Sequence, residues 1–168
     1  IAQTVFEGQN TIWSEMADVA GTIFSSGTTT RIDYTVYFPS GNDVRIENKF
    51  GNIYTTDHAG KTDINLSNGD LKAHRFGGPA RLKIEFGNAT VDEIVSGNIS
   101  LGYSEFNLEK AGDLSFESRS SKVYITEAGL LKLDAKRDRY YIKSAAEITG
   151  NAFFSYLSLD KVNSKINL

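Results

Sequence analysis

The stretch "KFGNIY" at residues 49–54 returns as "EFGNAT" at residues 85–90, thirty-six positions further along the chain. Gly69 lies midway between Gly51 and Gly87, so the underlying period is 18 residues. The series then continues at a period of 17, with serine or aspartate replacing glycine, at Ser104, Ser121, Asp138 and Ser155. All these residue types favour turns, and we interpret them as one corner of a repeating unit.

Each corner is followed by apolar or small residues two and four positions later, which is the alternation of a strand with one buried face. Seven such pairs occur in phase, at Ile53/Thr55, Leu71/Ala73, Ala89/Val91, Phe106/Leu108, Val123/Ile125, Tyr140/Ile142 and Leu157/Leu159. We expect these pairs to point inward and to stack on one another from copy to copy.

A second bend and a second alternating segment complete each copy. The bend residues are Ala59, Phe76, Ile94, Ala111, Ala128, Ala145 and Val162. The segments after them carry Ile64/Leu66, Leu82/Ile84, Ile99/Leu101, Leu114/Phe116, Leu131/Leu133, Ile148 and Ile166/Leu168. Such a unit cannot bury its apolar face alone, so the copies must stack. The sequence therefore predicts an all-β, single-domain parallel β-solenoid of about seven coils over residues 49–168, right-handed as parallel crossovers usually are.

An antiparallel meander or sandwich would fit the spacing of the strands equally well. It would not explain why two types of corner alternate strictly, so we prefer the solenoid. Residues 1–48 lie outside the repeat. Alternating apolar residues within residues 32–46 predict β-strands there, and we expect them to cap the open end of the stack, whose backbone groups would otherwise be unpaired.

The composition excludes several classes of function. The net charge is -3 and no run of lysine or arginine is present, so we expect no nucleic-acid partner. The chain contains no cysteine and therefore neither disulfides nor thiolate metal sites. No stretch approaches the ~18 apolar residues of a membrane helix, so we expect no direct membrane insertion.

Candidate catalytic and metal-binding residues are few. His58 and His74 fall in adjacent coils, where we expect solvated bend positions, and with Asp57 they would form only a loose surface cluster. A metal site needs three or four converging ligands, so no metal or cofactor is expected. Asp92 and Glu109 would be outward neighbours in successive coils, at a separation typical of retaining glycosidases. Catalytic acids need a shielding cleft, however, and a 17-residue coil leaves little room for one.

Surface aromatic residues give the remaining signal. The outward row three positions after each corner brings Tyr124 and Tyr141 side by side, next to Lys122 and Arg139 in the adjacent row. Aromatic side chains beside cations bind sugars or partner proteins. Cross-strand stacking that only stabilises the sheet is the alternative. These four residues are the candidate binding face, and no catalytic residue is nominated.

The segment "YTVYFPSGNDVRIENKFGNI" at residues 34–53 resembles the opening motif of adhesin-like β-solenoid families of unknown function, typical of Bacteroidetes envelope proteins. The later corners resemble the repeats of these families, up to about Val162, although four of them carry serine or aspartate instead of glycine. The resemblance implies export to the periplasm or cell surface, with or without a lipid anchor on a preceding segment. It supplies no catalytic residues.

We therefore expect a non-enzymatic envelope protein, an adhesin whose solenoid presents a flat face to a glycan or a protein. A structural spacer or self-associating module is the first alternative. An enzyme acting on polysaccharides through Asp92 and Glu109 is the second.

Overall fold

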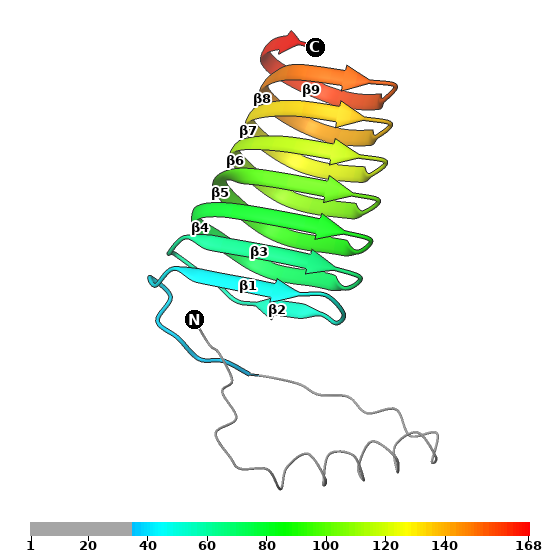
Figure 1. Ribbon diagram of the computed structural model, residues 1–168. Coiled ribbons are helices and arrows are strands. Elements are labelled where there is room, and N and C mark those ends of the chain that lie inside the picture. Colours follow the sequence, from blue (N-terminus) through cyan, green and yellow to red (C-terminus); the bar gives the residue numbers. More distant parts are fainter. Residues whose placement is uncertain (1–34) are drawn as a thin grey trace, which may run out of the picture. The chain divides into compact units, whose positions relative to one another are not determined.

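The computed structural model describes residues 35–168 (Figure 1). The chain divides into two units, Ile1–Phe38 and Pro39–Leu168. All the described strands belong to the second unit, and the described end of the first, residues 35–38, forms no strand. Of residues 1–48, which we expected to form capping strands, residues 1–34 lie outside the described part of the chain. The strand expected through Val36 and Phe38 is not present in residues 35–38.

The second unit is a stack of parallel strands. The elements are β1 (Val44–Asn48), β2 (Ile53–Thr55), β3 (Thr62–Ser67), β4 (Asp70–Glu85), β5 (Asn88–Gly102), β6 (Glu105–Arg119), β7 (Lys122–Lys136), β8 (Arg139–Phe153) and β9 (Tyr156–Asn167). They follow the order β1-β3-β4-β5-β6-β7-β8-β9, and β2 pairs with β4. Every pairing is parallel. The described residues contain no helix, and the prediction of an all-β parallel β-solenoid is confirmed.

The long elements β4 to β8 each contain both strands of one coil and the bend between them, as Figure 1 shows for the ribbons that wrap around the stack. β1 pairs with β3 in the register Val44↔Thr62 and so adds a strand to the stack. It lies within the stretch that we expected to cap the solenoid.

The inward pairs of the first strand form one wall of the core. In coils two to six both members of each pair are buried, from Leu71 and Ala73 to Tyr140 and Ile142. Three aromatic rings pack edge to face in the interior, with Phe116 between Phe106 and Tyr140 at centroid distances of 5.9 and 6.0 Å. Burial of each large side chain contributes roughly 1.5–3 kcal/mol, so the stack is held mainly by this apolar column.

The second strand differs in detail from our prediction. It has three inward positions rather than two, and Ile99 pairs with Phe116, whereas Leu114 pairs with Gly97. Our alignment had placed Leu114 opposite Ile99, which is wrong by two residues. Because side chains alternate with a period of two, a slip of two residues leaves every side chain on its correct face.

The first bend also needs correction. The bridge partner of Phe76 is His58 rather than Ala59. His58 thus takes the inward bend position of its coil and is buried, so the expectation of a solvated His58 was wrong. His74 is exposed, as expected.

The early and the later corners are built differently. At the early glycine corners, a Cβ on Gly69 would clash with the carbonyl oxygen of Gly51, so only glycine fits there. At the later corners, a side-chain oxygen accepts the backbone N–H of the equivalent residue one coil earlier. Gly87 donates to Ser104 at 3.4 Å and Ser104 donates to Ser121 at 3.2 Å. Serine therefore replaces glycine without breaking the repeat.

Candidate binding face

The start of each long strand presents alternate side chains outward, just after the serine or aspartate corner. Lys122 pairs with Arg139 and Tyr124 pairs with Tyr141 between β7 and β8. The buried Val123 and Ile125 on either side of Tyr124 fix its outward direction, since successive side chains of a strand point to opposite faces. The predicted proximity of these four residues is confirmed.

The two tyrosines stack on each other. The ring centroids of Tyr124 and Tyr141 are 5.0 Å apart and the ring planes are inclined by 15°. Tyr156, at the start of β9, adds a third ring at 5.9 Å from Tyr141, tilted by 54°. The sequence analysis missed Tyr156 because it falls in the row of Arg139, its cross-strand partner, and not in the row of the other tyrosines.

Lys122 joins the aromatic and the charged parts of this face. Its Nζ lies 4.9 Å from the centroid of the Tyr124 ring, a cation–π geometry. The same Nζ lies 3.8 Å from a carboxylate oxygen of Glu105 in the preceding coil. Hydrogen bonding to Tyr124 is the largest of the effects that raise the pKa of Lys122. The ammonium group therefore stays charged at neutral pH.

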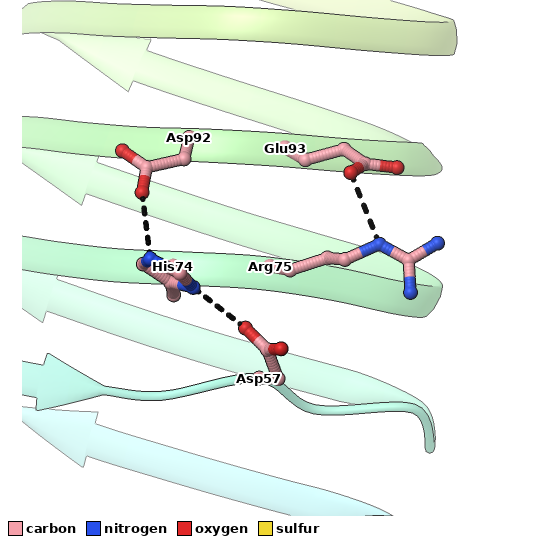
Figure 2. A network of polar contacts seen from close by, with 5 residues as sticks. All are labelled: Asp57, His74, Arg75, Asp92 and Glu93. Carbon is pink, nitrogen blue, oxygen red and sulfur yellow. Dashed lines mark hydrogen bonds and ion pairs between the residues drawn. The ribbon is translucent and has the colours of Figure 1, made fainter.

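A second polar cluster lies on the same side of the stack, in the earlier coils (Figure 2). His74 stands between two carboxylates, with Nδ1 at 2.8 Å from Asp57 and Nε2 at 3.3 Å from Asp92. The hydrogen bond that His74 donates to Asp57 is the main cause of the raised pKa of His74. Beside it, Arg75 pairs with Glu93 at 3.1 Å.

The loose surface cluster expected from His58, Asp57 and His74 forms only in part. Asp57 and His74 are in contact, but His58 is buried on the inward side, and the two ring nitrogens of His74 point to carboxylates in different coils. Across residues 35–168, no three histidine, aspartate or glutamate side chains converge to hold a metal ion.

Asp92 and Glu109 occupy neighbouring outward positions, between the register pairs Val91↔Leu108 and Glu93↔Lys110. The Asp92 side chain is half exposed and interacts with His74, and Glu109 is exposed. Neither carboxylate is shielded from water, and shielding is what would set the acid and base roles of a glycosidase pair.

A second aromatic stack lies at the corner itself. Phe86 and Tyr103 lie in successive coils with their ring planes inclined by 2° and their centroids 5.2 Å apart. Both have positive φ, 54° and 51°, a conformation that bulky residues rarely adopt. Both rings are more than half exposed, whereas Tyr124 and Tyr141 are partly buried. This pair is nevertheless a second stack between successive coils, and it serves as a comparison for the Tyr124–Tyr141 stack.

Comparison of the chain with protein-family models, with curated proteins and with solved structures finds no match. Within the described residues, no helix is long and apolar enough to span a membrane.

Proposed function

We propose that this protein is a non-enzymatic binding module of the cell envelope, an adhesin-type protein whose solenoid presents Tyr124, Tyr141, Lys122 and Arg139 to a glycan or a protein. One observation carries the proposal: two stacked tyrosines lie in register beside two cations on an outward strand face. We place the protein in the periplasm or at the cell surface because residues 34–53 resemble envelope families.

Tyrosine and arginine suit this role for physical reasons. A tyrosine side chain gives a large, rigid contact area and a hydroxyl group, and it loses little conformational entropy on binding. Arginine and tyrosine are enriched at the positions that contribute most to binding energy. On this face the rings are already held by each other and by the strand pairing, so little further ordering is needed when a ligand binds.

Binding of the protein to a broad glycan panel and to whole bacterial and host cells tests the proposal. The Tyr124→Ala/Tyr141→Ala variant should lose binding while its melting temperature stays close to that of the wild type. The Phe86→Ala/Tyr103→Ala variant removes a more exposed aromatic stack at the corner and should bind normally. Equal loss in both variants, or binding that persists in the first, would contradict the assignment of the face.

The same experiment addresses the two alternatives. A wild-type protein that binds no glycan and no cell would favour a structural spacer. Turnover of any polysaccharide that disappears in the Asp92→Asn variant would favour the enzyme. The exposure of Asp92 and Glu109 and the contact between Asp92 and His74 support binding over catalysis.

A further inference from the structure

Five basic side chains gather at two successive corners of the solenoid, where β6 leads into β7 and β7 leads into β8. These are the turns that follow the arrowheads of β6 and β7 in Figure 1. We refer to these residues as the basic corner: Arg119, Lys122, Lys136, Arg137 and Arg139. All are exposed except Lys122, which is half-buried. The rest of the chain is net acidic, since the whole protein carries a charge of -3.

The basic corner places like charges directly opposite each other. Arg119 pairs with Lys136 between β6 and β7, and Lys122 pairs with Arg139 between β7 and β8. Like charges at directly opposed positions destabilise a sheet. Glu117 and Asp134 form the next outward pair beside Arg119 and Lys136, so carboxylates offset that pair of cations. No acidic pair follows Lys122 and Arg139 on their strands, where the next outward residues are tyrosines, so the stacking of the coils gives no reason for this second pair.

The opposite bend of the stack, followed from β4 to β7, gives an internal comparison. Its outward row reads Arg75, Glu93, Lys110 and Glu127, so each cation stands opposite an anion. This alternation is what stacking alone favours. The like-charge pairs of the basic corner are confined to two neighbouring coils. In the preceding coils, the row of Arg119 carries Glu85 and Gly102, and the row of Lys122 carries Glu105.

The cations of the basic corner are mostly left to the solvent. Lys122 is near Glu105, but among the ion pairs of the described residues none involves Arg119, Lys136, Arg137 or Arg139. The buried Asp138 lies beneath them, and its carboxylate oxygens accept hydrogen bonds from backbone N–H groups and from Ser118. Lys122 and Arg139 thus border the three tyrosines, and Arg119, Lys136 and Arg137 lie across the turn from them.

The arrangement of the tyrosines favours a hydroxyl-rich polyanion over a nucleic acid. A single-stranded nucleic acid stacks its bases on free aromatic faces. Here Tyr141 is covered by Tyr124 on one side and approached by Tyr156 on the other, so the row offers ring edges and hydroxyl groups. Hydroxyl groups beside closely spaced cations suit a chain that carries many hydroxyls and regularly spaced acid groups.

We propose that the ligand of this face is an acidic polysaccharide, whose carboxylate or sulfate groups pair with the basic corner while its hydroxyls contact the tyrosines. The strand separation of ~4.8 Å places successive cations about one sugar residue apart along the stack. Arginine guanidinium groups pair with such anions through two parallel hydrogen bonds. This inference rests on the proposed binding function and specifies the ligand class for the same face.

The test is binding of the whole chain, by calorimetry at two salt concentrations, to polygalacturonate, dextran sulfate, neutral dextran, polyglutamate and a single-stranded oligonucleotide. The two acidic polysaccharides should bind, more weakly at high salt, and neutral dextran should not. Their relative affinities show whether carboxylate or sulfate is preferred. The Arg119→Gln/Arg139→Gln variant should bind them at least about tenfold more weakly, because each arginine makes charge-assisted contacts.

A matched control removes two positive charges elsewhere. The Lys132→Gln/Lys161→Gln variant alters exposed lysines outside the basic corner and should bind like the wild type. An equal loss in this variant would show that net charge alone drives binding and would overturn the inference. Circular-dichroism melting of all variants separates loss of binding from loss of the fold.

The outcomes separate this inference from the proposed function. Neutral glycans binding as well as acidic ones, with loss only in the Tyr124→Ala/Tyr141→Ala variant, would overturn the inference and leave the proposed function standing. Preference for polyglutamate would also overturn it, in favour of an acidic protein partner. Preference for the oligonucleotide, or no binding of any kind here or on the glycan and cell panel, would overturn both.

Discussion

The carboxylate of Asp138 accepts the backbone N–H of Ser121 across the boundary between two coils, with 2.7 Å between Oδ1 and the nitrogen. Its other oxygen accepts the N–H of Lys136 at 2.7 Å and the hydroxyl of Ser118 at 2.9 Å. The buried Asp138 carboxylate thus accepts a backbone N–H from the preceding coil, as the Ser104 hydroxyl does from Gly87. It accepts two further hydrogen bonds as well.

Asp138→Ala should destabilise the solenoid by about 2–4 kcal/mol, because the N–H groups of Ser121 and Lys136 lose their acceptor in a buried corner. Asp138→Ser should cost about 1–2 kcal/mol, since a hydroxyl at this position can still accept the N–H of Ser121. Denaturant unfolding measures both. Equal losses in the two variants would mean that the cross-coil hydrogen bond contributes little.

Asp138 should also make stability depend on pH. Burial raises its pKa above the ordinary value of 3.8, against the opposing effect of its hydrogen bonds. The folded state therefore binds the proton more tightly than the unfolded state, and this contribution is fully present below about pH 4 and is lost as the pH rises through the raised pKa. The stability of the wild type relative to Asp138→Ser should decline over that range. If the stability advantage of the wild type over Asp138→Ser grew with pH instead, the folded state would favour the ionised form of Asp138.

The period and the first strand of the solenoid could be predicted because each coil repeats one corner residue and two inward positions. The second strand was less well determined. Its three inward positions allow a slip of two residues at Leu114 without any change of face, so polarity alone cannot fix the register. The prediction for His58 failed for another reason. Its side chain is polar, so we expected it at the surface, but its pairing with Phe76 places it in an inward position, where it is buried.

The candidate face was predictable as far as backbone register determines it. The spacing of 17 residues places Tyr141 next to Tyr124, and both cations follow from the same spacing. The contact between Tyr141 and Tyr156 depends on side-chain direction across two rows, which no periodicity encodes. The basic corner joins residues on both sides of a turn, so a search along single rows could not find it.

His74 should titrate above its ordinary pKa of 6.5, because Asp57 and Asp92 favour its charged form from both sides. The stabilisation from this ion cluster is fully present below about pH 6.5 and is lost as the pH rises through the raised pKa. The midpoint of His74 in an NMR titration should fall in the Asp57→Asn and Asp92→Asn variants. Glu109→Gln, one coil further on, is the control and should leave it unchanged. A midpoint that does not respond to either aspartate would contradict the cluster.

Leu133 and Asp134 test the face assignment of the second strand at adjacent positions. Leu133 is 1% exposed and packs in register with Phe116, whereas Asp134 is exposed. Leu133→Ala should cost about 2–5 kcal/mol, from lost burial and from the cavity left between coils. Asp134→Ala should change stability by no more than about 0.5 kcal/mol. Because a slip of one residue would exchange the two sides of the strand, chemical denaturation that gives equal losses for both variants would rule out this register.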